Sequence, residues 1–389
     1  MRSVELFAGG GGLAIGLDQA GFEPQVIVEL NKDACNTLRQ NYLTDGEHLL
    51  YEGDIKKFDY QQVNEPVALV SGGPPCQPFS LGGSHKAHND DRDMFPEAVR
   101  AIRELQPKAF IFENVKGLLR KTFTEYFEYI ILQLQYPSMA KYEGEDWEHH
   151  LSRLEQHHTS LHEPELEYKV VYRLLNSADY GVPQKRERVF IVGFRADVDA
   201  RWSFPEPTHS DEALFWDKWV SGNYWNRHRI PQPNLDDKTL RKVDRLEKKY
   251  GMFAPETLPW VTVRDALSNI PDPRTNTEHS FLNHEFKDGA RSYPGHTGSY
   301  IDEPSKTLKA GAHGVPGGEN MIRYEDGSIR YFTVRESARI QTFPDNYVLE
   351  GAWGEAMRQL GNAVPVELAR KVGASVHEAL LRVEQQDRQ

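Results

Sequence analysis

The sequence has little cysteine and no long apolar run. Only Cys35 and Cys76 occur among its 389 residues, so no disulfide framework holds the fold. No run of about 18 apolar residues is present, so we expect no membrane-spanning helix and no membrane partner. The first residues pass directly into the apolar segment 4–7 without the core of a signal peptide. Together these absences predict a protein of the reducing cytoplasm.

Basic residues are also outnumbered. The chain has 46 Lys and Arg against 58 Asp and Glu, a net charge of −12. Because phosphate binding depends on Lys and Arg, this balance argues against a general nucleic-acid coat. The acidity is uneven, however, since residues 194–332 hold 19 Lys and Arg against 21 Asp and Glu, only −2 of the total. A cleft that gathers cations in this middle region is compatible with the composition.

Short apolar segments alternate with helical periodicities through the first 135 residues. This alternation predicts an α/β fold with a doubly wound, mostly parallel sheet. Two later apolar segments lie close enough in the chain to pair as antiparallel strands. The strands are expected at 3–7, 25–29, 67–71, 109–112, 168–175 and 188–194, and the helices at 12–20, 33–41, 95–105 and 364–383.

Two regions differ in character from this pattern. Residues 136–167 are predicted to form a surface insertion, with a solvated helix around 147–156. Its pairs His149-His150 and His157-His158 have no cysteine and no tight ligand spacing beside them, so no metal site is predicted. After residue 194 the regular alternation stops, which predicts a smaller, irregular second domain.

A glycine cluster follows the first expected strand, in the segment 6–13. Glycines at this place let the backbone turn tightly towards a ligand at the N-terminus of the next helix. Glu29 ends the next strand, where an acid commonly accepts hydrogen bonds from a ribose. Asp54 follows another strand end and suits an adenine amino group. Dinucleotide dehydrogenases have the same three elements, so these residues alone do not identify the cofactor.

One segment narrows the possible classes of enzyme and cofactor. It is Ser71-Gly72-Gly73-Pro74-Pro75-Cys76-Gln77-Pro78-Phe79-Ser80. A cysteine between prolines at a strand end has a constrained backbone and suits a nucleophile. Glu113, directly after the expected strand 109–112, lies at the same sheet edge and could give a proton while sulfur attacks. Arg186 and Arg188 alternate along an expected strand, so both could point into one cleft.

These segments occur together in one order that is typical of a known family. The chain resembles the DNA (cytosine-5)-methyltransferases, most closely the bacterial modification enzymes. The resemblance leaves residues 136–167 and 195–304 without a matching motif. It is carried by Phe-Ala-Gly-Gly-Gly-Gly at 7–12, Pro-Pro-Cys-Gln-Pro-Phe-Ser at 74–80, Glu-Asn-Val at 113–115, Gln-Lys-Arg-Glu-Arg at 184–188, the segment 335–344 and Gly-Asn-Ala-Val-Pro at 361–365.

The resemblance assigns the catalytic roles. It implies that Cys76 adds to carbon 6 of cytosine and that Glu113 holds or protonates N3. Arg188 would contact O2 of the base and steady Glu113. The base must be flipped out of the duplex, because carbon 6 is inaccessible in the stack. The residues expected to contact DNA are Gln77, Ser80, Gly83, Arg186 (at a phosphate) and Thr307, which with Leu308 matches the family's Thr-Leu pair better than Thr257-Leu258 does.

The resemblance implies that the cofactor is S-adenosyl-L-methionine. It also implies the fold of the S-adenosylmethionine-dependent methyltransferases. A family position that is often aromatic is Leu30 here, so adenine stacking would be weaker. The expected cofactor residues are Phe7, Ala8, Gly9, Gly12, Leu13, Glu29, Leu30, Asp54, Ile55, Pro75, Met94, Asn362 and Val364. The catalytic domain would then comprise residues 1–193 and 346–389, with a target-recognition domain at 194–345.

The leading hypothesis is a site-specific DNA methyltransferase that acts on double-stranded DNA as a monomer, in a restriction-modification system with a separate endonuclease. One alternative is a tRNA cytosine-5 methyltransferase, but the Cys-Phe-Thr tripeptide of that branch is absent. Another is a nicotinamide- or flavin-dependent oxidoreductase, which leaves Cys76 and Glu113 unexplained. A catalytically inactive binding module would not need all the residues that the chemistry uses.

Overall fold

The computed structural model describes residues 1–42, 49–63, 66–75, 93–160, 166–275, 281–294, 296–310 and 320–386. Contacts between Cα atoms divide the chain into two compact units. Unit 1 comprises Met1–Leu175, Glu187–Phe204 and Ala369–Gln389, and unit 2 comprises Asn176–Arg186 and Pro205–Leu368. The predicted boundaries between the catalytic and target-recognition domains, at 193/194 and 345/346, stay a prediction.

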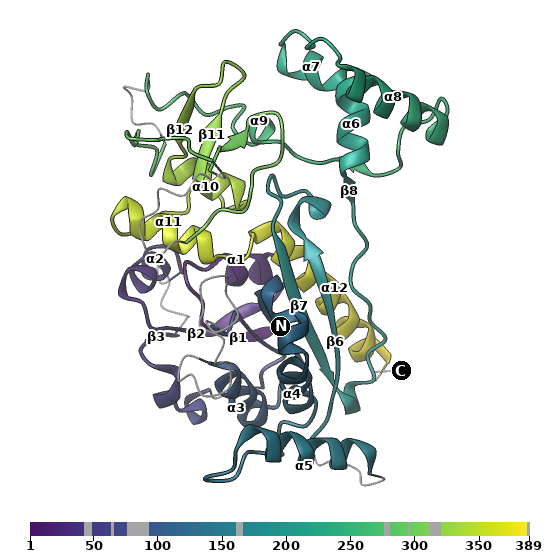
Figure 1. The fold of residues 1–389 in the computed structure, drawn as a ribbon. Helices are drawn as coiled ribbons and strands as arrows, with labels where there is room; N and C mark the ends of the chain where they lie inside the picture. Colours follow the sequence, from purple (N-terminus) through teal and green to yellow (C-terminus); the bar gives the residue numbers. More distant parts are fainter. Residues whose placement is uncertain are drawn as a thin grey trace. The chain divides into compact units, whose positions relative to one another are not determined.

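Unit 1 is built on a seven-stranded sheet in the order β3-β2-β1-β4-β5-β7-β6 (Figure 1). The first five of these strands run parallel, and β7 pairs with β5 in the antiparallel direction. The predicted mostly parallel α/β fold is therefore confirmed. The strands are β1 (Arg2–Leu6), β2 (Glu23–Glu29), β3 (Leu49–Glu52), β4 (Leu69–Gly72), β5 (Ala109–Val115), β6 (Tyr168–Asn176) and β7 (Glu187–Arg195).

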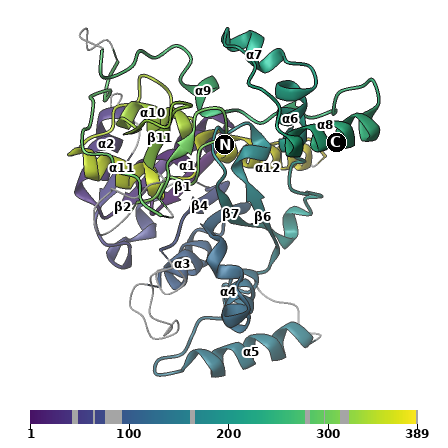
Figure 2. The same ribbon diagram turned by 45° about the horizontal axis from the view of Figure 1, so that its top comes forward.

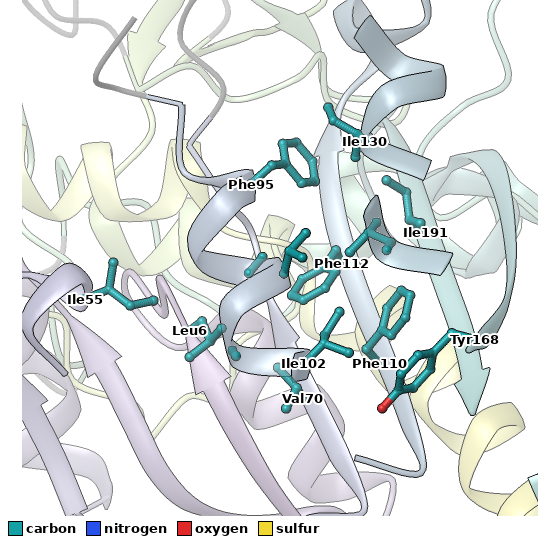
Figure 3. Packing of buried hydrophobic residues seen from close by; sticks show 14 of the residues in the cluster. Leu6, Ile55, Val70, Phe95, Ile102, Phe110, Phe112, Ile130, Tyr168 and Ile191 are labelled. Atoms are coloured by element: carbon teal, nitrogen blue, oxygen red, sulfur yellow. The ribbon is translucent and has the colours of Figure 1, made fainter. Parts of the chain in front are cut away.

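Helices cover both faces of this sheet, because successive side chains of a strand point to opposite faces. Val26 and Val28 of β2 belong to the main core, whereas Ile27 between them packs with Leu38 of α2 (Lys32–Tyr42) on the other face. The main core lies between the sheet and the helices α3 (Phe95–Leu105) and α4 (Thr124–Gln135). Figure 3 shows Phe95, Ile102 and Ile130 of these helices meeting Leu6, Val70, Phe110, Phe112 and Ile191 of the strands.

Two helices distant in sequence pack together in unit 1. A Cβ placed on Gly373 of α12 (Val366–Gln386) would lie 2.7 Å from the side chain of Leu17 in α1 (Gly12–Gln19). The glycine is therefore required for this close packing. No helix in the described ranges is both long and apolar enough to cross a membrane.

The predicted helix in the inserted region is α5 (Trp147–Thr159), but one face of it is buried. His150 is only 1% exposed, and its ring bonds to the Tyr129 hydroxyl and to the Met139 carbonyl, both at 2.8 Å. His158 bonds to the Tyr136 hydroxyl in the same way. These histidines are tied to α4 and the chain just after it, so the expectation of a solvated helix is wrong for this face. Within the described residues, no cluster of three His, Cys, Asp or Glu could hold a metal.

Unit 2 has short strands and helices, as Figure 2 shows from a second angle, and its buried apolar residues form small clusters. Strands β10, β11 and β12 form a three-stranded sheet, and β8 pairs with β9. The strands are β8 (His209–Ser210), β9 (Leu258–Pro259), β10 (Ser299–Tyr300), β11 (Met321–Arg323) and β12 (Ile329–Tyr331). The helices are α6 (Asp211–Trp219), α7 (Asn223–His228), α8 (Asp237–Tyr250), α9 (Val263–Ala266), α10 (Val334–Ile340) and α11 (Trp353–Asn362).

Candidate active site

One edge of the unit 1 sheet collects most of the predicted site residues. The five parallel strands end on the same side, so the segments that follow them lie along one edge. The strand order reverses at β1, which is flanked by β2 and β4. Ligands bind at such reversal points in open α/β sheets. The residues at this edge are the glycine loop after β1, Glu29 at the end of β2, Asp54 after β3, Pro74-Pro75 after β4 and Glu113 in β5.

The glycine loop after β1 turns through left-handed backbone conformations. Phe7, Gly9 and Gly11 have φ angles of 54°, 54° and 82°, and Gly11 is the N-cap of α1. A side chain resists such angles, and glycine accepts them without strain. A Cβ built on Gly9 would meet no atom within 4 Å, so space is open beside this glycine. A ligand could therefore approach the backbone at the positive end of α1.

Glu29 fixes the loop to the end of β2. Its carboxylate accepts the N–H of Gly9 at 2.7 Å, of Leu30 at 2.9 Å and of Asn31 at 2.7 Å. An ionised carboxylate has about four acceptor positions. Three are used by these amides, so Glu29 can take one more donor, such as a ribose hydroxyl.

Two apolar residues beside this loop differ in exposure. Leu30 is 69% exposed, whereas Ile55 is 5% exposed. Asp54 precedes Ile55 and accepts the Lys56 N–H at 3.0 Å, which caps the short helix Ile55–Lys57. The exposed surface of Leu30 would leave water if an apolar ring lay against it.

Pro75 and Met94, predicted to lie near the cofactor, are joined by a backbone hydrogen bond. The Met94 N–H donates to the Pro75 carbonyl at 3.3 Å. Phe7 and Met94 both pack partly buried against the main core. This bond joins the chain just after β4 to the chain just before α3.

Glu113 and Arg188 form an ion pair at the sheet edge. Arg188 Nε lies 2.8 Å from Glu113 Oε1, and the side chains are 13% and 9% exposed, respectively. The Glu-Asn-Val motif was expected after the strand, but it lies within β5, because β7 pairs with it as far as Val115. Arg188 stands opposite Val115, two residues from Glu113, so both side chains project from the same face. Burial lowers the pKa of the Arg188 guanidinium, and Glu113 opposes that shift.

Asn114 is a site residue that the sequence analysis missed. Its side-chain amide donates to the Pro74 carbonyl at 2.9 Å, and its carbonyl oxygen accepts the Val115 N–H at 2.9 Å. Asn114 is 5% exposed. It ties β5 to the loop that leads to Cys76. Its place between Glu113 and Val115 in the motif was the available signal.

Four predicted residues lie outside the described residues. Cys76, Gln77, Ser80 and Gly83 belong to the segment 76–92. Their roles stay predictions from the sequence.

The first half of the Gln-Lys-Arg-Glu-Arg motif belongs to unit 2, where it holds the predicted Thr-Leu segment. Gln184 Oε1 accepts the Leu308 N–H at 3.1 Å, and the Thr307 hydroxyl donates to the Lys185 carbonyl at 2.8 Å. Arg186 is fully buried and donates to the carbonyls of Leu308 at 3.2 Å and Gly361 at 2.8 Å. A phosphate contact by Arg186 would require it to leave both carbonyls.

Gly361 lies against the chain that follows Thr307-Leu308. A Cβ on Gly361 would be 2.4 Å from the Ala310 nitrogen, so only glycine fits there. Asn362 ends α11 and is exposed, whereas Val364 is buried. Both residues belong to unit 2, and their part in cofactor binding stays a prediction.

Comparisons with known proteins identify the family of the chain. The chain matches the family described as C-5 cytosine-specific DNA methylase over residues 1–138 and 148–378. It is 32% identical over 375 residues to the Type II methyltransferase M.PspPI of Psychrobacter sp. (strain TA137), covering 96% of this chain and 78% of that protein. It is 30% identical to the Type II methyltransferase M.NgoMIV of Neisseria gonorrhoeae, covering 97% of each chain.

Solved structures are similar in fold. A prophage-encoded protein of Escherichia coli, described as a DNA modification methyltransferase, superposes with a TM-score of 0.59 at 19% identity, covering 98% of this chain and 99% of that one. The Dnmt2 methyltransferase of S. pombe superposes with a TM-score of 0.55 at 16% identity and the same coverage.

Proposed function

The chain belongs to the C-5 cytosine-specific DNA methylase family, and we propose that Cys76, Glu113 and Arg188 carry out its methyl transfer to carbon 5 of cytosine. The observation that carries the assignment is the buried Glu113–Arg188 pair, 2.8 Å apart at the carboxyl edge of the sheet. Asn114 holds the neighbouring loop at Pro74, two residues before Cys76. These contacts would bring the nucleophile and the acid to one base.

The proposed reaction begins when the Cys76 thiolate adds to carbon 6 of a flipped-out cytosine. Glu113 holds or protonates N3, so that the ring accepts the electron pair. Arg188 contacts O2 and keeps Glu113 in place. With the cofactor bound, carbon 5 would take the methyl group as the bond between that group and the cofactor's sulfonium sulfur breaks. Loss of the carbon 5 proton would then restore the 5,6 double bond, and the carbon 6–sulfur bond would break to release Cys76.

S-adenosyl-L-methionine supplies the electrophilic methyl group when it is bound. The open space beside Gly9 and the remaining acceptor position on Glu29 fit this cofactor. Asp54 would take the adenine amino group, and Leu30 and Ile55 would flank the ring. The remaining residues that would hold it are Phe7, Ala8, Gly12, Leu13, Pro75, Met94, Asn362 and Val364.

The relatives, which are Type II methyltransferases, support the biological setting that we propose. The proposed substrate is a short sequence in double-stranded DNA, protected against a separate cognate endonuclease. We expect the enzyme to act as a monomer in the cytoplasm, with Gln77, Ser80, Gly83 and Thr307 near the DNA.

The first test is methyl transfer from radiolabelled S-adenosylmethionine to unmethylated genomic DNA, followed by bisulfite sequencing. Methylation confined to one short sequence would support the proposal. Incorporation into bulk tRNA instead would favour the RNA alternative. The variant Cys76→Ala should lose methyl transfer by several orders of magnitude while it still binds DNA. Full activity in this variant would refute the covalent mechanism.

A further inference from the structure

Helix α8 of unit 2 carries six basic residues, and only some of them serve the fold. Lys242 Nζ lies 3.1 Å from Asp211 Oδ2, and Lys249 Nζ lies 2.7 Å from Glu212 Oε2. Both acids are on α6, and the buried Leu246 belongs to the same helix as the two lysines. This side of α8 therefore explains its attachment to α6 (Figure 1).

The other four cations lie on a strip of α8 that directly adjoins the two paired lysines. Lys238, Arg241, Arg245 and Lys248 follow one another at spacings of three, four and three residues. At 3.6 residues per turn they fall within an arc of about 80°. All four are exposed, and none has an ion-pair partner within the described residues. The helix does not use these four cations internally, so they are available to a partner.

An exposed apolar tip, Met252-Phe253, directly follows the end of α8. α8 ends before Gly251, whose φ angle of 63° turns the chain, and Met252 and Phe253 are 94% and 77% exposed. The Phe253 N–H donates to the Tyr250 carbonyl at 3.2 Å, so the tip has a defined turn. These two adjacent apolar side chains are the most exposed of the large hydrophobic residues that the structure describes, so they could be covered by a partner.

We propose that the four cations of α8 and the tip Met252-Phe253 form a contact surface for duplex DNA in unit 2. The proposal rests on the proposed function, and it assigns a role in the region 195–304, where the sequence analysis found no motif. The four cations extend over about 15 Å of helix, a length at which duplex DNA carries about four phosphates per strand. α8 holds six basic residues against three acidic ones in a chain of net charge −12, and this local excess of positive charge complements the phosphates.

The test measures DNA affinity at several salt concentrations, using the full chain and a duplex that contains a methylated sequence. In the test variant, Lys238, Arg241, Arg245 and Lys248 are changed to Gln. Each lost phosphate contact should reduce the slope of log K against log salt by about 0.9, so the slope should fall by about 3.6. The turnover rate at saturating DNA and low salt should stay at the wild-type value. An unchanged slope would overturn the proposal.

A matched control is the variant in which Lys242 and Lys249, on the same helix, are changed to Gln. Because these two lysines are paired with α6, the control should leave the slope unchanged. A comparable fall in slope would contradict the assignment of the contacts to the four unpaired cations.

The variant Phe253→Ser tests the apolar tip. It should weaken DNA binding without changing the slope, and an unchanged affinity would show that the tip is not part of the contact surface. A wild-type protein that methylates no DNA refutes the proposed function, whereas methylation with an unchanged slope in the test variant refutes only this surface.

Discussion

Arg188 Nε lies 2.8 Å from Glu113 Oε1, and the two residues come from adjacent antiparallel strands. Both side chains are largely buried, so neither charge can be stabilised by water to the usual extent. Removing one member of such a pair leaves the other uncompensated, which costs more than the loss of a surface ion pair. The position of the catalytic acid therefore depends on the arginine.

We expect Arg188→Ala to lower the rate of methyl transfer by about 10²-fold or more, because Glu113 loses the cation that orients it. Single-turnover methylation of a duplex at saturating cofactor measures this. The control is Lys116→Gln, which breaks the neighbouring ion pair with Glu187 at 2.8 Å between exposed side chains. Exposed pairs contribute little, so this variant should keep wild-type activity. Wild-type rates in Arg188→Ala would show that Glu113 is positioned without it.

Asn114→Ala should slow turnover without weakening DNA binding. The change removes the bond to the Pro74 carbonyl and leaves that buried loop less restrained, at a cost of about 1–3 kcal/mol in the free energy of unfolding. Urea unfolding measures the stability, and separate kcat and KM values measure the effect on the site. If kcat is unchanged while stability falls, Asn114 has a structural role alone.

Stability should fall in mild acid because of His150. Burial lowers the pKa of its imidazole below the ordinary value of 6.5, so the folded protein keeps this ring neutral. Below pH 6.5 the unfolded chain takes up a proton that the folded chain refuses, and stability is lost as the pH falls. Thermal unfolding between pH 5 and 8 should show this loss in the wild type and a smaller one in His150→Gln.

The neighbouring His149 is the control. It is exposed, and hydrogen bonding to Asp146 raises its pKa. The folded chain therefore binds a proton on His149 more readily than the unfolded chain does, and this stabilises the folded chain as the pH falls. His149→Gln should retain the acid-induced loss of stability. An equal reduction of that loss in both variants would contradict the assignment to His150.

Glu5 should make the folded protein less stable as the pH rises. Burial in β1 raises the pKa of its carboxyl from 4.5 to about 8, against a hydrogen bond from the Ser71 hydroxyl that lowers it. Between these values the folded chain holds a proton that the unfolded chain releases, so stability falls as the pH rises. Glu5→Gln keeps a neutral group of similar shape, and its thermal stability relative to the wild type should increase from pH 5 to 8. A constant difference across that range would contradict the prediction.

Much of the fold follows from local sequence patterns. The expected helix 95–105 matches α3, and most expected strands match within a few residues, because apolar runs bounded by glycine and proline are strong signals. The strand β5 is longer than expected, since the polar Glu113 and Asn114 hide the end of an apolar run. Only the pairing with β7, distant in the sequence, extends it.

The site was less predictable where a residue depends on distant partners. Arg186 bonds to carbonyls 122 and 175 residues away, a contact that no local pattern contains. His150 has a similar explanation, since α5 looks polar along its sequence yet buries one face against aromatic residues of α4. By contrast, Glu29 comes only 20 residues after Gly9 in the sequence. The hydrogen bond between the two residues lies in the glycine loop that the sequence predicts.

The division of the Gln-Lys-Arg-Glu-Arg motif between two units constrains protein engineering. Unit 2 includes Asn176–Arg186 as well as Pro205–Leu368, and unit 1 resumes at Glu187. A chimera that grafts only residues 205–368 from a relative would combine a foreign Thr-Leu segment with the resident Gln184 and Arg186. Exchange of target specificity between relatives should therefore succeed more often when both segments are transplanted together, with the donor's own 176–186.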